Sequence, residues 1–162
     1  TVIGVGLALF NDVLLLLMLV PMLPSLLDGQ PDETRIACLF SAKDVCQMLV
    51  APLAGAFTLR VGARTSLSLS LVSLSLATCA FAEARGFPAL LLARALQGVT
   101  SAALMSGGLT LIAETHDADQ RGTAIAQAHS GLGVGAALGP VLGGLLFESA
   151  GRRVTFYAAA AF

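Results

Sequence analysis

The sequence predicts an all-α fold, a polytopic bundle of transmembrane helices, and two observations carry that prediction. Of the 162 residues, 56% are hydrophobic and only 12% are charged, with a mean hydropathy of +0.85. A soluble domain carries about 25% charged residues, so half of the charge that a water-facing surface needs is missing. The apolar residues also gather in stretches of about 20, the length at which a helix crosses a membrane.

Short polar turns divide the sequence into five complete apolar spans and the start of a sixth. The predicted spans are residues 2–27, 36–57, 65–82, 87–113, 123–147 and 154–162. They form a single transmembrane domain. We expect this domain to be incomplete at both ends, because the chain opens inside one apolar run and closes inside another.

Two of these spans have alternatives that the residues argue against. Span 2–27 lacks the basic flank of a signal peptide and is too long for one. In span 65–82, Ser and Leu nearly alternate, as in a membrane β-strand, but no other segment alternates. We therefore predict a helix, on which Ser66, Ser70 and Ser73 share a face where small hydroxyls allow close packing.

The arginines indicate an orientation. Arg60 and Arg64 lie in a short loop without acids, which the positive-inside rule places in the cytoplasm. The turns after the first, third and fifth spans then face outward or into a lumen. Arg152 and Arg153, in the last of these turns, argue for the opposite orientation.

Asp12, beside Asn11, is the first candidate for a functional residue. It lies roughly 15 Å into its helix, near the middle of a ~30 Å hydrocarbon layer. An ionised carboxylate there costs at least about 2.5–3.5 kcal/mol and usually lines a cavity. We interpret Asp12 as a proton carrier or as a partner for a cationic substrate. The structural alternative is a carboxylate that is hydrogen-bonded to a neighbouring helix.

Lys43 and Asp44 bring two further charges into the second span. Adjacent residues point about 100° apart on a helix, so they do not fully neutralise each other. Lys43 is expected to pair with Asp12 or with a carboxylate in a missing part of the protein. In the alternative, the lysine snorkels to a membrane interface, which is strained at its depth of ~11 Å from the start of the span.

Arg94 and Gln97 form a third candidate group, in the fourth span. A guanidinium keeps its proton, so within lipid it needs carbonyls, acids or water. Arg94 either tunes a nearby acid or ties helix ends together, and both interpretations stay open.

A glycine stripe runs along the fifth span. Its members are four residues apart and form a close-packing surface of the small-xxx-small kind. They are Gly131, Gly135, Gly139 and Gly143. Pro140 and the pair Gly143–Gly144 add a bend or a weak point.

Several function classes are disfavoured. The net charge of −1 offers no basic patch for nucleic acid, and the three cysteines lack metal-ligand spacing. His129 and Ser130 are adjacent and point apart on a helix, so they do not form a hydrolase site. We expect no enzyme activity, no metal and no cofactor, which leaves an ion gradient as the energy source.

Five short motifs lie in order along the spans. They are Phe10–Asp12 with Leu19–Pro24, Leu39–Lys43 with Gln47–Pro52, Gly55–Arg64, Leu91–Gly98 and Gly135–Gly144. Together they resemble the motifs of the major facilitator superfamily, and more closely those of its vesicular amine transporters. Singly each motif is a modest signal, but five in order over nearly the whole chain are specific.

The resemblance implies a function. The complete protein would exchange lumenal protons for a cytoplasmic cationic amine, with the site between two six-helix halves, of which this chain is the amino-terminal one. The position of Asp12 would recognise the amine, and that of Lys43 would pair with an acid of the carboxyl-terminal half. The segment Gly135–Gly144 would let the fifth helix rock and would limit proton leak.

The sequence also departs from the family pattern. Its loop motif retains Gly55, Arg60, Gly62 and Arg64. However, Leu59 stands where an acid or amide is usual, the connection 28–35 is short and has no glycosylation site, and Asp44 is unusual beside the lysine. A multidrug–proton antiporter of the same superfamily therefore remains an alternative, as does a non-transporting scaffold or truncated product.

The expected partners are the lipid bilayer, a small cationic substrate, protons and the missing carboxyl-terminal half, with no nucleic acid. The expected location is a vesicle or other acidic organelle, with the plasma membrane as the alternative.

Overall fold

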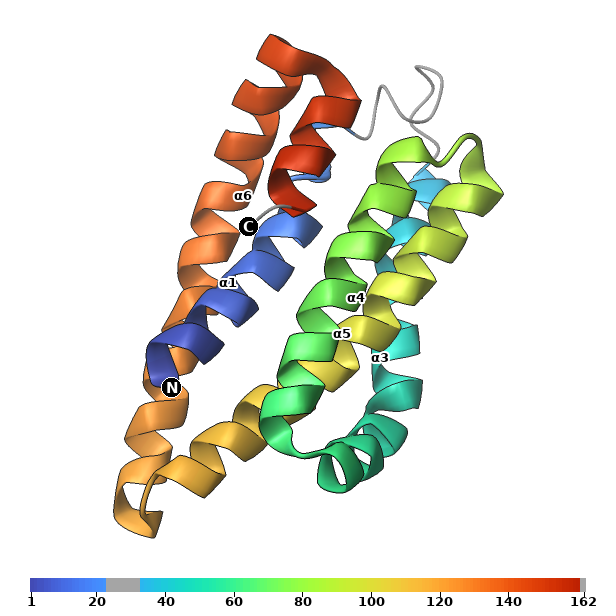
Figure 1. Ribbon diagram of the computed structural model, residues 1–162. Coiled ribbons are helices and arrows are strands. Elements are labelled where there is room, and N and C mark those ends of the chain that lie inside the picture. Colours follow the sequence, from blue (N-terminus) through green and yellow to red (C-terminus); the bar gives the residue numbers. More distant parts are fainter. Residues whose placement is uncertain (23–32, 161–162) are drawn as a thin grey trace.

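A computed structural model describes residues 1–22 and 33–160, and every regular element in these ranges is helical (Figure 1). The elements are α1 (Val2–Leu17), η1 (Val20–Met22), α3 (Glu33–Val61), α4 (Ala63–Glu83), α5 (Phe87–Thr115) and α6 (Ala118–Ala160). Five segments are long and apolar enough to cross a membrane. The predicted all-α fold class is thus confirmed. Residues 23–27 of the first expected span and 161–162 of the last lie outside the described residues.

Glycines with positive φ mark three of the boundaries between helical segments, and these are Gly62, Gly86 and Gly151. Gly62, with φ of 87°, separates α3 from α4. Gly151, with φ of 72° and ψ of 175°, interrupts α6, so the expected segment 123–147 and the described part of the expected segment 154–162 lie on either side of it. Residues other than glycine rarely adopt such φ values. A positive φ also departs from α-helical geometry, so the helix ends at these glycines.

Pro140 does not interrupt α6, and the bend or weak point expected there stays a prediction. The only non-helical backbone within α6 is at Gly151, and Pro140 lies inside the continuous part. Membrane helices tolerate a proline because the surrounding protein and local adjustments satisfy the freed backbone groups.

The helices pack in two groups (Figure 1). Helix α1 lies along α6, while α5 packs against both α3 and α4. Helix α4 also contacts α6 and so joins the two groups. The α3–α4 and α5–α6 turns lie at one end of the bundle, and the α4–α5 turn and the Gly151 bend lie at the other. The chain therefore alternates direction, as successive membrane spans must.

The glycine stripe of α6 faces α1. A Cβ atom added at any of its four members would come within 3.0 Å of an α1 atom or of Met18, which follows α1, and real Cβ atoms essentially never approach so closely. At Gly135 the nearest atom would be the carbonyl oxygen of Phe10, and at Gly143 that of Met18, each 2.6 Å away. The absence of side chains thus lets the backbones of α1 and α6 touch.

The serines of α4 divide between two environments. Ser66 and Ser70 are buried, and a Cβ added at Gly107 of α5 would lie 3.2 Å from the Ser66 hydroxyl. Helix α5 therefore approaches α4 closely on this face. Ser73 is exposed, so the expectation that it shares the packed face was wrong. Three residues of helix rotate it about 60° away from Ser70, which is enough to leave the narrow contact.

The stripe leads to a test of stability. Gly143→Ala should lower the stability of the full-length protein, because overpacking a tight contact costs about 1–3 kcal/mol. Gly133→Ala is the matched control, since a Cβ there meets nothing within 4 Å. Thermal melting followed by size-exclusion chromatography measures both variants. Equal melting temperatures would contradict the close α1–α6 contact.

Candidate functional site

A buried ion pair joins α1 to α3. The Lys43 ammonium lies 3.0 Å from Oδ2 of Asp12, and the Ser101 hydroxyl of α5 donates a 2.5 Å hydrogen bond to Oδ1. Residue exposures are 3% for Lys43, 8% for Asp12 and 1% for Ser101. Both carboxylate oxygens of Asp12 therefore have a partner, and α1, α3 and α5 meet at this carboxylate.

Gly98 of α5 makes this meeting possible. A Cβ atom on Gly98 would collide with the carbonyl oxygen of Lys43 and would lie 3.1 Å from Cβ of Cys46. Because no side chain separates them, α3 approaches α5 at the level of Lys43. Ser101 follows Gly98 by three residues, which is less than one turn of α5. Its hydroxyl therefore reaches Asp12 near the level of Lys43.

These contacts decide between the alternatives for Lys43. Its burial excludes snorkelling to an interface, and its partner among the described residues is Asp12. The neighbouring Asp44 is exposed and has no hydrogen bond or ion pair within the described part of the chain. The two adjacent charges thus occupy different environments, in line with the ~100° turn between them.

Arg94 is held by α4 and α5. Its guanidinium is 1% exposed and lies 5.0 Å from the ring centre of Phe81. It donates a 2.9 Å hydrogen bond to Oε1 of Gln97, and Gln97 donates from Nε2 to the Thr78 hydroxyl at 3.2 Å. Thr78 in turn donates to the carbonyl oxygen of Leu74 at 2.8 Å. A chain of polar contacts thus anchors the arginine to the neighbouring helix.

Three buried polar side-chain atoms in these helices lack a hydrogen-bond partner in the described part of the chain. The Nε and Nη2 atoms of Arg94 and Oδ1 of Asn11 are buried and find no partner among the described residues. Buried polar atoms are normally hydrogen-bonded, and an unpaired one costs about 1–3 kcal/mol.

The loop-motif residues lie at the α3–α4 turn. The Thr58 and Ser66 hydroxyls are 2.9 Å apart across it and tie the two helices together. Arg60 and Arg64 are exposed and make no hydrogen bond or ion pair with the described residues. Gly55 is half-buried on α3, with the Ser106 hydroxyl 4.0 Å from where its Cβ would lie. These residues are well apart in sequence from the ion pair, and no contact joins them to it.

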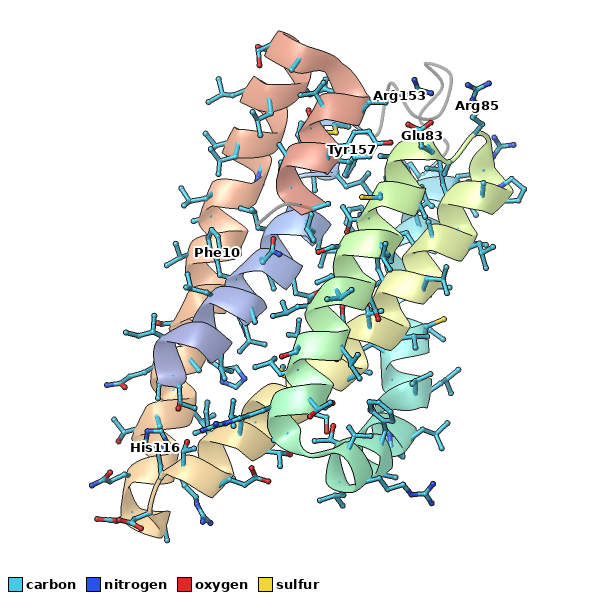
Figure 2. All side chains as sticks on the ribbon, viewed as in Figure 1. Phe10, Glu83, Arg85, His116, Arg153 and Tyr157 are labelled. Atoms are coloured by element: carbon cyan, nitrogen blue, oxygen red, sulfur yellow. The ribbon has the colours of Figure 1, made fainter. Side chains whose placement is uncertain are left out.

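A second polar cluster lies at the opposite end of the bundle, where Figure 2 shows Glu83, Arg85, Arg153 and Tyr157 close together. Glu83 pairs with Arg153 at 2.8 Å and accepts a 2.9 Å hydrogen bond from Tyr157. Both side chains of the pair are about half exposed. The cluster ties the end of α4 to the segment that follows Gly151.

A groove of about 880 Å³ lies beside α1 and α6, and Phe10 and His116 border it (Figure 2). Its lining is mostly apolar and does not include Asp12 or Lys43. Within the described ranges, no cluster of His, Cys, Asp or Glu could hold a metal ion.

Sequence reasoning did not single out Ser101, Thr78 or Phe81. Ser101 lies seven residues after Arg94 and four after Gln97, so helical spacing puts all three on one face of α5, and this signal would have found it. Thr78 and Phe81 are ordinary members of an apolar span, and only the packing of α4 against α5 shows their role.

Helices of membrane-spanning length with paired charges buried between them define an integral, multi-pass membrane protein. The sequence profile of the Major Facilitator Superfamily, a family of transporters, matches residues 2–162, and the chain belongs to this family.

Its relatives include vesicular transporters. The probable vesicular acetylcholine transporter-B of Danio rerio is 36% identical over 92% of this chain and 32% of its own length. The vesicular acetylcholine transporter of Homo sapiens is 34% identical over 82% of the chain and 25% of its own. The chromaffin granule amine transporter of Homo sapiens is 34% identical over 78% and 24%. The resemblance inferred from the motifs is confirmed, and the chain spans a third or less of these relatives.

The buried pair leads to a double-mutant test in the full-length protein. Asp12→Asn or Lys43→Gln alone should cost about 3–5 kcal/mol, because each leaves one buried charge without a partner. The double variant should recover part of this loss. The half-exposed Glu83–Arg153 pair is the control, with an expected coupling of about 0–1 kcal/mol. Thermal unfolding measures both cycles, and purely additive losses at Asp12 and Lys43 would contradict the pairing.

Proposed function

We propose that the whole protein, of which this chain spans the amino-terminal part, exchanges protons for small organic cations of the monoamine or acetylcholine type across a vesicle membrane. Support comes from the family, from relatives that are named as vesicular acetylcholine and amine transporters, and from the buried charges. The remaining, carboxyl-terminal half would supply the other wall of the transport pathway.

The observation that carries this proposal is the buried Asp12–Lys43 pair. When a proton binds Asp12, the carboxylate loses its charge, and Lys43 is left as a buried cation without a counter-charge. That state costs several kcal/mol unless the helices rearrange to give Lys43 another acceptor. Proton binding and helix movement are therefore coupled through one interaction, which is what a proton-driven exchanger requires.

Ser101 and the Arg94 group shape the energetics of the pair. A protonated Asp12 retains one oxygen that can accept from Ser101, so the carboxyl group stays in place while Lys43 departs. Arg94 lies within electrostatic reach of Asp12 and adds a second positive charge to the surroundings of the pair. With Asn11, Lys43 and Gln97, these residues form the candidate binding region for protons and substrate.

The glycine stripe defines the part that moves. Helix α1 carries Asp12 and touches the backbone of α6 at Gly135 and Gly143, whereas Lys43 lies on α3 in the other group. A close-packed pair such as α1 and α6 moves as one body more readily than it separates. In this proposal, loss of the ion pair lets the α1–α6 unit shift against α3 and α5, and its tight backbone contact leaves no path for proton leak.

The direct test is uptake by the full-length protein in proteoliposomes with an acid interior. We expect uptake of acetylcholine or a monoamine that collapses with a protonophore and is lost in Asp12→Asn, since no ionised carboxylate then remains to be neutralised by the proton.

Asp119→Asn is the matched control, because Asp119 is exposed at the start of α6, and it should transport normally. Proton-coupled exchange that persists in Asp12→Asn would overturn the coupling role. Transport of structurally diverse lipophilic cations in place of these amines would indicate a multidrug antiporter instead.

A further inference from the structure

The Ser101 hydroxyl on α5 is bonded to another helix rather than to its own. Serine and threonine within a helix usually donate to a carbonyl oxygen of that helix, three or four residues earlier. Ser70 and Thr78 of α4 do so, at 2.7 and 2.8 Å, and each bonds the carbonyl four residues back. Ser101, which is 1% exposed, donates instead to Oδ1 of Asp12 on α1 at 2.5 Å.

These two kinds of acceptor exclude each other. A hydroxyl group has one hydrogen to donate, so Ser101 cannot bond to Asp12 and to a carbonyl of α5 at the same time. An ionised carboxylate is the stronger acceptor, because a hydrogen bond to a charged group is roughly twice as strong as one between neutral groups. In the proposed exchange, Asp12 takes up a proton and this advantage is lost. The carbonyls of α5 then compete for the hydroxyl at the step in which Lys43 leaves the pair.

Thr100 fills the acceptor that would compete at the usual spacing. Four residues before Ser101 is the carbonyl oxygen of Gln97, and the Thr100 hydroxyl donates to it at 2.8 Å. Within an α-helix the same oxygen also accepts from the backbone N–H of Ser101. A carbonyl oxygen has two lone pairs, so both are in use. The Ser101 hydroxyl is therefore left directed at Asp12.

Thr100 itself lies away from the ion pair. It is half-buried and borders a mostly apolar crevice of about 390 Å³ between α3, α4 and α5, whose lining includes neither Asp12 nor Lys43. Adjacent residues point about 100° apart on a helix, so Thr100 and Ser101 face different sides of α5. A change of the Thr100 hydroxyl is thus expected to act on Asp12 through the Gln97 carbonyl and Ser101.

We propose that Thr100 and Ser101 are positioning residues for the Asp12 carboxyl group. Thr100 fills the Gln97 carbonyl, and the Ser101 hydroxyl is thereby kept on Asp12 in both protonation states of the carboxyl group. This inference rests on the proposed function and deepens it, because it assigns to α5 the task of holding the carboxyl group while Lys43 moves away. Asp12 then presents the same oxygen, Oδ2, each time the pair forms again. Neither hydroxyl needs to contact the substrate.

Acid-driven uptake of acetylcholine and dopamine by the full-length protein in proteoliposomes tests the role of Ser101. Ser101→Ala should lower the maximal rate about tenfold, the size of one hydrogen bond to a charged group, and should leave the half-saturating amine concentration within about threefold. The charges that attract the amine are unchanged in this variant. Ser70→Ala is the matched control, because it removes a buried hydroxyl that bonds its own helix, and it should transport normally.

The role of Thr100 is tested in the same assay. Thr100→Val removes the hydroxyl and keeps the shape of the side chain, so it should lower the maximal rate about threefold by freeing the Gln97 carbonyl to compete for Ser101. Thr100→Ser retains the hydroxyl and should recover most of this loss. In a Ser101→Ala background, Thr100→Val should have no further effect, because the two residues act in series.

Three results would overturn the proposal. They are a normal maximal rate in Ser101→Ala, losses that multiply when Thr100→Val is added to it, and a raised half-saturating concentration with an unchanged maximal rate. The last result would assign Ser101 to substrate binding instead.

Thermal unfolding of the full-length protein gives a second measurement, which does not depend on transport. Ser101→Ala should lower Tm in the unaltered protein but much less in an Asp12→Leu, Lys43→Met background, where the acceptor is absent. Ser70→Ala should have the same effect in both backgrounds. Equal losses for Ser101→Ala would overturn the positioning role even if uptake is normal. If the losses differ as expected but the unaltered protein shows no acid-driven uptake, the proposed exchange fails while the contact stands.

Discussion

An ammonium and a carboxylate that are both removed from water can be tolerated only together, and this constraint governs the arrangement of the bundle. Lys43 and Asp12 come from different helices, and Ser101 from a third, so the pair forms only if α1, α3 and α5 all reach one point. Removing either charge leaves the other one buried and unpaired in a medium of low dielectric constant. The packing around the pair is accordingly built to bring backbones unusually close.

Glycine is the means of that approach. Gly98 lets α5 lie against the Lys43 backbone, Gly107 lets it lie against α4, and the stripe on α6 does the same for α1. Between membrane helices, van der Waals contact replaces the hydrophobic effect as the source of association, because lipid is as apolar as leucine. The contacts that stabilise the bundle therefore also fix the level along the helices at which each charged group lies.

The two ends and the middle of the bundle differ in what their charges can do. Glu83 and Arg153 pair at an exposed end, where water screens them and makes their contribution small. Asp12, Lys43 and Arg94 lie where screening is weak, so a single proton alters the balance of the whole group. For this reason, the exchange proposed above assigns the coupling between a proton and helix movement to the middle of the bundle.

The sequence by itself determined the all-α class, the apolar spans and the charged residues within them, because a membrane demands long apolar helices and makes every internal charge conspicuous. It also set the glycine spacing, although not what the stripe would touch. Only the tertiary structure decided that Lys43 pairs with Asp12, that Ser101 and Thr78 join the polar contacts, that α6 is interrupted at Gly151, and that Asp44 is exposed. Local periodicity tells which residues share a helix face, but which faces meet depends on close contacts between residues far apart in the chain.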